Sequence, residues 1–166
     1  ARKVLGCKKC DASEGIYIGE VNDTAALTTA AAGASTVAIA VGLSGHEPAS
    51  LGKAIEFVGV QNTVGALLTK ANLAAQGGLA QFRVVLCSSM GTTDPAPKPM
   101  EGGSILFWKL NAEAFIASSG VPFAIVKPCG LMATPGNKTL LIGHDDSLLT
   151  TKPPIVARED VARVMQ

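Results

Sequence analysis

Hydrophobic positions follow two spacings along the chain, and the two spacings predict strands and helices in alternation. Apolar residues three or four apart indicate a helix, whereas continuous apolar runs of short length suit buried parallel strands. Runs of strand type lie at 15–21, 35–42, 82–89, 122–128, 139–143 and 153–157. Segments of helical type lie at 22–33, 53–76, 104–118 and 158–165. This order predicts an α/β fold with a doubly wound parallel sheet, formed by a single domain over residues 1–166.

Three of the predicted strands end in small or polar residues. These ends read Ala40-Val41-Gly42, Ser88-Ser89-Met90-Gly91 and Lys127-Pro128-Cys129-Gly130. In doubly wound sheets, ligands bind beyond the carboxyl ends of the strands. We therefore expect a ligand site along this edge of the sheet.

Charge and hydropathy narrow the classes of partner. The 166 residues include 14 basic and 13 acidic side chains, and 16% are charged. Because there is no basic run and little aromatic content, we expect no nucleic acid partner. The longest apolar run, 35–43, is of strand length and falls short of the roughly 18 residues that a membrane span needs. No transmembrane segment is therefore expected.

The four cysteines are Cys7, Cys10, Cys87 and Cys129. The first two form one C-x-x-C motif, but a zinc site would need a second pair of ligands. A redox motif of the thioredoxin type would need a strand before it and a helix after it. We expect reduced, mostly structural thiols and no metal.

Four segments of the chain carry recognisable motifs, and these are VVLCSSMGTTDP (84–95), FWKLNAEAF (107–115), SGVPFAIVKPCGL (119–131) and IVAREDVARVM (155–165). Read together, they resemble the short-chain dehydrogenase/reductase superfamily, and above all its atypical, NmrA-like branch. The region 19–42 is also similar to the part of that family that packs around adenine. The resemblance covers nearly all of the chain. It implies a Rossmann-like, NAD(P)-binding domain, and it favours an organelle, in particular the plastid, with the cytoplasm as the alternative.

The resemblance also implies roles for single residues. Lys109 corresponds to the family lysine that holds the nicotinamide ribose, and Ser89, or else Ser88, to the serine that orients the substrate. The family tyrosine stands four residues before the lysine, on the same helical face, and that position is Ile105. Isoleucine cannot transfer a proton, and general acid–base catalysis contributes about 10²–10⁴-fold. Catalysis is therefore doubtful; an active protein would be an NAD(P)-dependent oxidoreductase or epimerase.

Further positions are expected at the cofactor by the same resemblance. They are Glu20, Val21, Ala40, Val41, Gly42, Asn62, Ser88, Pro128, Cys129, Gly130 and Leu131. Asn62 is either the helix asparagine that supports the lysine through water or an ordinary exposed polar residue.

The Gly-rich turn that holds a pyrophosphate is not found. Gly42 and Gly45 follow a strand, but the next position of a G-x-x-G-x-x-G pattern is Pro48. By resemblance, the first β-α-β unit, about 30 residues or more, is missing before residue 1. We expect a longer protein that binds NADP or NAD through that unit; without the unit we expect no cofactor.

Two other functions stay open. The chain is either a non-catalytic accessory or assembly subunit of a larger, organellar complex, or a structural domain without a ligand. Loops 92–103 and 129–152 would shape any substrate pocket. Within the second loop, Asp145 and Asp146 are expected to be solvated.

Overall fold

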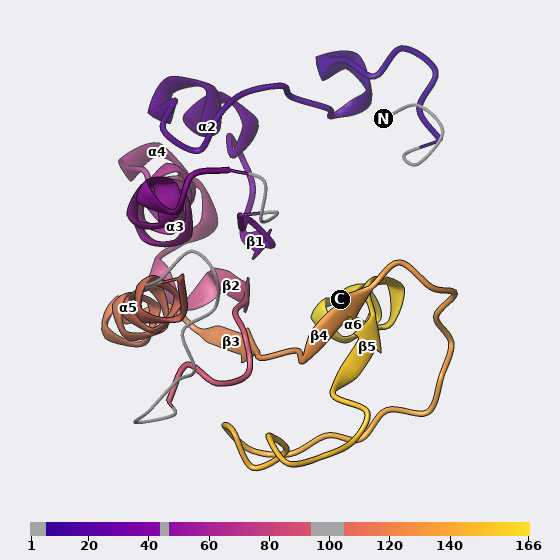
Figure 1. The fold of residues 1–166 in the computed structure, drawn as a ribbon. Coiled ribbons are helices and arrows are strands. Elements are labelled where there is room, and N and C mark those ends of the chain that lie inside the picture. The colour runs from indigo at the N-terminus through magenta and orange to yellow at the C-terminus, as the bar shows by residue number, and fades with distance from the viewer. Residues whose placement is uncertain (1–5, 44–46, 94–104) are drawn as a thin grey trace.

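The computed structural model describes residues 6–43, 47–93 and 105–166 (Figure 1). Its α-helices are α2 (Thr24–Ala30), α3 (Gly59–Leu67), α4 (Lys70–Gln76), α5 (Ile105–Ser118) and α6 (Arg158–Met165). Its strands are β1 (Thr36–Ile39), β2 (Arg83–Cys87), β3 (Phe123–Val126), β4 (Gly130–Met132) and β5 (Ile155–Ala157). Short 3-10 turns are η1 (Ala12–Glu14), η2 (Ala49–Leu51) and η4 (Leu79–Gln81), and η3 (Lys53–Val58) is a π-helix. Among the described residues, no helix combines the length and the apolar character that crossing a membrane requires.

Two parallel sheets organise the chain. Strands β1, β2 and β3 form the larger sheet in that order, with Val37 opposite Val84 and Leu86 opposite Ile125. Strands β4 and β5 form the smaller one, and α6 follows β5 directly. Helices α3 and α5 lie on one side of the larger sheet, whereas the β4–β5–α6 unit lies beyond β3 (Figure 1). The predicted α/β architecture with parallel strands is confirmed.

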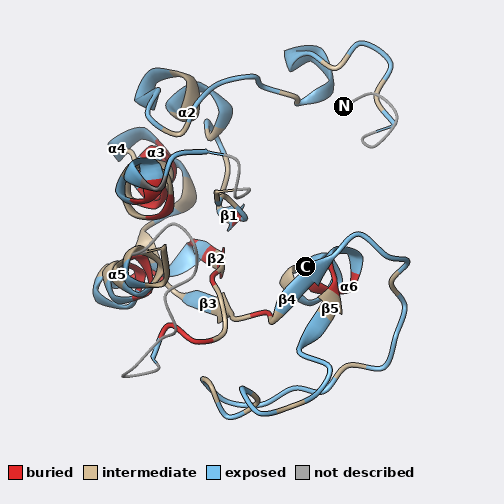
Figure 2. Cartoon of the chain, viewed as in Figure 1, coloured by how far each residue is buried: buried red, intermediate tan, exposed pale blue. Residues whose placement is uncertain are grey.

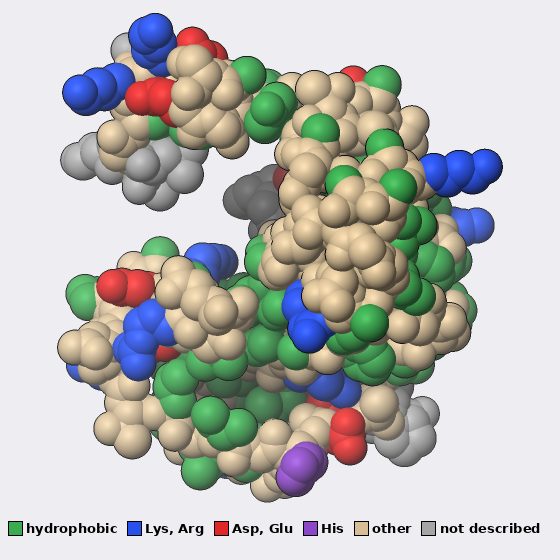
Figure 3. All heavy atoms as spheres, turned by 180° about the vertical axis from the view of Figure 1, so that it is seen from behind, with side chains coloured by type: hydrophobic (Ala, Val, Ile, Leu, Met, Phe, Trp, Pro, Cys, Tyr) green, Lys and Arg blue, Asp and Glu red, His purple; other side chains and the backbone are tan. Residues whose placement is uncertain are grey.

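The core lies between the larger sheet and helices α3 and α5 (Figure 2). Its buried side chains are Ile39, Val60, Val64, Leu67, Phe82, Val84, Leu86, Ala112, Ile116 and Val121. The opposite face of the sheet is more open, since Ala38 and Ala124 are exposed and Val85 is half-buried. From behind, hydrophobic side chains gather around a hollow in the lower part of the molecule (Figure 3).

Two predicted strands do not form. Residues 15–21 and 139–143 lie in no ladder, and Ile18 and Ile142 are 90% and 77% exposed. A strand exists through hydrogen bonds to a neighbouring strand, and in the described part of the chain neither segment pairs with one. In place of 139–143, it is β4 (Gly130–Met132) that pairs with β5 in the carboxyl-terminal part of the chain.

The single helix predicted over 53–76 is three elements. It starts as the π-helix η3, continues as α3 and breaks at Leu68 and Thr69 before α4. Thr69 has extended backbone, and its side chain accepts a hydrogen bond from the Asn72 N–H, so it caps α4. The buried Asn72 amide also donates to the Ala31 carbonyl and so joins α4 to the end of α2.

The expectation of reduced thiols is wrong for one pair of cysteines. Cys7 and Cys10 form a disulfide, because a turn with a positive φ at Cys10 places their Cα atoms 5.2 Å apart, within disulfide range. Cys87 and Cys129 are free, as expected, and both are half-buried. Hydrogen bonds from the backbone N–H groups of Cys10, Lys9 and Lys8, in order of decreasing effect, lower the pKa of the exposed Glu14 carboxyl below its ordinary value.

Candidate functional site

The carboxyl ends of β1, β2 and β3 meet at one edge of the larger sheet, because the strands are parallel. The ladder between β2 and β3 continues past both strands. The Ser88 N–H donates to the Val126 carbonyl over 2.8 Å, and the Met90 N–H donates to the Pro128 carbonyl over 3.0 Å. Two of the three predicted strand ends, 88–91 and 127–130, are therefore held side by side.

Lys109 reaches the end of β1. Its Nζ atom lies 2.7 Å from Oε2 of Glu56, and the two side chains are 15% and 2% exposed. A Cβ atom on Gly42 would lie 3.7 Å from this Nζ and 3.4 Å from Glu56 Oε1. Lys109 is thus a half-buried, paired lysine directly beside the Gly42 backbone.

Glu56 is a site residue that the sequence analysis missed. It lies on the π-helix η3, and one carboxylate oxygen accepts a hydrogen bond from the Leu43 N–H over 2.9 Å. Short π-helical stretches often occur at functional sites. A single acidic residue in the apolar stretch 54–60 was the signal that could have found it.

Trp108 fixes α5 against η3. Its ring stacks on Phe57 with the centroids 6.1 Å apart, and the Lys53 ammonium lies 5.5 Å from the centroid. A Cβ atom on Gly52 would be 3.3 Å from the indole ring. Glu56 directly precedes Phe57, and Lys109 directly follows Trp108. The stacking of the two rings therefore helps to hold the Glu56–Lys109 pair together.

Cys87, the last residue of β2, lies near this ion pair. Burial raises the pKa of its thiol, an effect that the nearby Lys109 charge opposes and the Glu56 charge reinforces. The net direction is upward, so the thiol is protonated at neutral pH.

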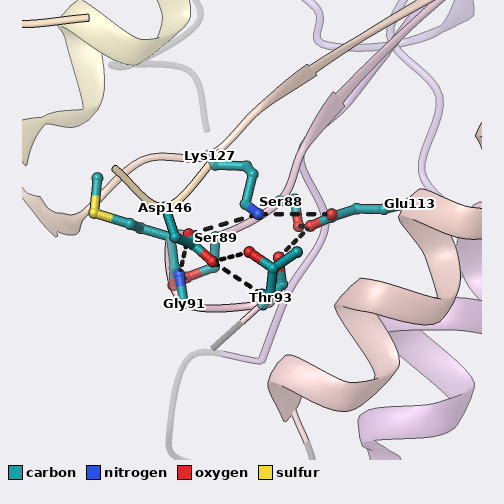
Figure 4. A network of polar contacts seen from close by, with 9 residues as sticks. Ser88, Ser89, Gly91, Thr93, Glu113, Lys127 and Asp146 are labelled. Carbon is teal, nitrogen blue, oxygen red and sulfur yellow. Dashed lines mark hydrogen bonds and ion pairs between the residues drawn. The ribbon is translucent and has the colours of Figure 1, made fainter. Parts of the chain in front are cut away.

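A second polar network begins with Ser88 and Glu113 (Figure 4). The buried Ser88 hydroxyl donates to Glu113 Oε1, and the Thr92 hydroxyl donates to the same oxygen over 2.8 Å. Ser89 stays outside this pair, and its hydroxyl donates to the Met90 carbonyl over 3.0 Å. Ser89 is half-buried and Ser88 is buried, so Ser89 is the more accessible of the two predicted serines.

Asp146 belongs to the same network, and the expectation that it is merely solvated is wrong. Its carboxylate accepts hydrogen bonds from the Gly91 N–H over 2.6 Å, from the Thr93 N–H over 2.9 Å and from the Thr93 hydroxyl. Burial raises the pKa of Asp146, but these hydrogen bonds and the nearby Lys127 charge outweigh it, so the pKa is lowered overall. The neighbouring Asp145 is exposed.

Asn62 holds a different predicted segment in place. Its amide donates to the Val21 carbonyl over 2.9 Å. Val21 also packs on α3, where a Cβ atom on Gly59 would come within 2.7 Å of its Cγ2. The structure thus places residue 21 against α3, while Glu20 is exposed. A support of Lys109 by Asn62 through water stays a prediction.

The remaining predicted positions lie around the strand ends. Pro128 is buried, Val41, Cys129 and Ile105 are half-buried, and Ala40, Gly130 and Leu131 are exposed. Gly130 and Leu131 belong to β4 rather than to a loop. Residues 149–154 line a hollow of about 800 Å³. None of the predicted site residues lines it.

Comparison with known proteins identifies the family. Residues 9–166 match the NAD(P)H-binding family of domains. The chain belongs to this family. Its solved relatives share the fold: a Bacillus halodurans protein assigned as an NAD-dependent epimerase/dehydratase has a TM-score of 0.72 at 24% identity, over 90% of this chain and 63% of that one. Bordetella bronchiseptica WbmG, solved with NAD and UDP, has a TM-score of 0.55 at 17% identity, over 90% of this chain and 51% of that one.

Two curated relatives of this NAD(P)H-binding domain come from plants. One is an uncharacterised chloroplastic protein of Arabidopsis thaliana, 30% identical over 95% of this chain and 52% of that protein. The other is sanguinarine reductase of Eschscholzia californica, 44% identical over 48% of this chain and 30% of that protein. The chain therefore spans about half the length, or less, of the curated relatives that it matches.

Proposed function

We propose that this domain forms the nicotinamide end of an NAD(P) site in an atypical, NmrA-like short-chain dehydrogenase/reductase. The observation that carries the proposal is the position of Lys109 Nζ beside Gly42, at the carboxyl end of β1. Because Gly42 has no side chain, its backbone lies next to both charged groups of the pair, and a ribose held by Lys109 would lie against this backbone. The family match supports the same assignment.

The residues fit the nicotinamide half of such a cofactor. Lys109 would bind the ribose hydroxyls, and Glu56 would hold its ammonium in place. Ser89 would orient a substrate oxygen from the end of β2. A bound nicotinamide supplies or accepts a hydride. The pyrophosphate would need a Gly-rich turn from a longer protein, and whether NAD or NADP is bound depends on that part.

A second function is favoured by Ile105. This residue is half-buried at the start of α5 and stands where the family has its proton-transferring tyrosine. A protein that binds NAD(P)H without turnover, as an accessory or assembly subunit, accounts for it directly. The chloroplastic relative supports a plastid location for either function.

Cofactor titration tests the proposal. In the intact protein, NADPH and NADH are titrated by fluorescence against wild type and the double variant Lys109→Met/Glu56→Gln, which removes both charges together. A hydrogen bond to a charged group contributes about 1.5–3 kcal/mol, so the variant should bind at least about tenfold more weakly. Lys70→Met, at an exposed lysine on α4, is the matched control and should bind normally.

Unchanged affinity in the double variant would disprove the role of Lys109. Turnover then separates the two functions. If a panel of carbonyl substrates oxidises NADPH and Ser89→Ala abolishes the reaction, the protein is an enzyme. Binding without any turnover favours the accessory role.

A further inference from the structure

The turn after β2 holds a carboxylate from a distant part of the chain. Three donors of this turn, the Gly91 N–H, the Thr93 N–H and the Thr93 hydroxyl, converge on the two oxygens of Asp146 (Figure 4). The carboxylate comes from more than fifty positions further along the chain. Converging backbone N–H groups of this kind form a concave site that attracts anions.

Lys127 adds a positive charge to the same site. Its side chain is 10% exposed, and within the described part of the chain its buried Nζ makes no hydrogen bond. Asp146 Oδ1 lies 3.5 Å from it and Glu113 Oε2 lies 3.9 Å from it. A buried ammonium is costly unless it is paired and hydrogen-bonded. Lys127 therefore favours a closer anion than either carboxylate provides in this structure.

Asp146 sits on a segment with few other ties. Residues 144–149 bond mainly within themselves, through Ser147 N–H to the His144 carbonyl and Leu149 N–H to the Asp146 carbonyl. Among the described residues, the hydrogen bonds from 144–151 to other segments all involve Asp146. Leu149 adds an apolar contact, 3.9 Å from where a Gly91 Cβ would lie. The Asp146 carboxylate thus makes the main polar contacts between this segment and the turn after β2.

We propose that Gly91, Thr93 and Lys127 form a binding site for a small anionic group, a carboxylate or a phosphate, and that Asp146 is its built-in occupant. An acidic ligand that takes these donors displaces Asp146 and releases residues 144–149 from the turn that carries Ser88 and Ser89. The proposal does not depend on NAD(P) binding, because Gly91, Thr93, Lys127 and Asp146 are not among the positions expected to hold the cofactor.

Emptying the site by mutation tests this directly. In the intact protein, Asp146→Ala is titrated with sodium acetate and, separately, with inorganic phosphate, and the backbone amide signals of Gly91 and Thr93 are followed by NMR. We expect saturable shifts of both signals at millimolar anion. Wild type should bind at least about tenfold more weakly, because its tethered carboxylate competes at high effective concentration.

Three further variants make the result specific. Asp145→Asn removes the neighbouring exposed charge while keeping a side chain that tolerates the positive φ of that position, and it should behave as wild type. Asp146→Ala/Lys127→Met should lose most of the anion affinity of Asp146→Ala. Asp146→Ser has a side chain too short to reach the donors. It replaces Asp146→Ala in these titrations if Asp146→Ala does not fold.

Each outcome decides the proposal. Saturable binding of acetate alone assigns a carboxylate ligand, and binding of phosphate alone assigns a phosphate group. No saturable shift with either anion in a folded emptied variant overturns the site. Equal binding in wild type and Asp146→Ala, or binding that does not depend on Lys127, also overturns it. None of these readouts uses the cofactor, so they stand apart from the test of NAD(P) binding.

Discussion

At the scale of single residues, the buried Glu56 carboxylate determines the position of Lys109. Glu56 is almost fully buried, and a buried carboxylate is stable only with partners. Its partners are the Lys109 ammonium and the Leu43 N–H. Lys109 therefore has a structural task besides the proposed one at the cofactor, and its mutation affects folding as well as binding.

This double task gives a measurable prediction. Lys109→Met alone leaves the Glu56 carboxylate buried without its cation, and the free energy of unfolding should fall by about 3 kcal/mol. Lys109→Met/Glu56→Gln removes both charges and should recover most of this loss. Denaturant unfolding of Lys109→Met, Glu56→Gln and the double variant measures the coupling. Additive losses would show that the pair contributes little.

Asp146 predicts a response to acid. The pKa of Asp146 in the folded protein lies below the ordinary value of 3.8. The ionised carboxylate therefore stabilises the fold above pH 3.8, and this contribution to the free energy of unfolding is lost as the pH falls through the lower, folded pKa. The charged groups that face it from the packed elements are Lys127 and, beyond it, Glu113. Thermal unfolding of wild type and Asp146→Asn should differ at neutral pH and converge well below pH 3.8. A constant difference down to the lowest pH would contradict this.

At the scale of elements, helix α3 depends on glycine at one point of contact. A Cβ atom on Gly59 would lie 2.7 Å from Val21 Cγ2, whereas one on Gly65 would meet nothing within 4 Å. Gly59→Ala should therefore destabilise by about 1–3 kcal/mol through overpacking against Val21. Gly65→Ala, on the same helix, should stabilise by about 0.5–1 kcal/mol. Paired denaturant melts measure both, and a neutral Gly59→Ala would show that residue 21 moves freely.

The elements also show what pattern alone could foresee. Strands β1, β2 and β3 were predictable as strongly apolar runs and helix α5 as a long one. Helix α6 is short and mostly polar, but its apolar residues Val161, Val164 and Met165 stand at helical spacing. Residues 15–21 and 139–143 have the composition of strands, yet strand formation depends on a neighbour that composition does not reveal. The π-helical form of η3, which carries Glu56 to Lys109, was likewise not visible in the apolar spacing. In the structure, Phe57 of η3 stacks on Trp108 of α5.

The site was foreseen in part for the same reason. Motif order and the rule that parallel strands end at one edge predicted that Ser89 or Ser88 and Lys109 lie near the strand ends. The structure places these residues there, and their roles stay predictions. Asp146 could not, because its role depends on a loop that returns to the turn after β2 from more than fifty residues away. Only the folded arrangement distinguishes it from the exposed Asp145.

At the scale of the whole molecule, the thiols are distributed in a way that suits a chemical probe. Cys7 and Cys10 are joined to each other, and burial raises the pKa of Cys87, which reduces its reactive thiolate. Cys129 is the remaining cysteine, half-buried next to Pro128 at the predicted cofactor edge. A maleimide dye added to the unmutated protein should therefore label Cys129 first, and its emission would report ligands arriving at the strand ends.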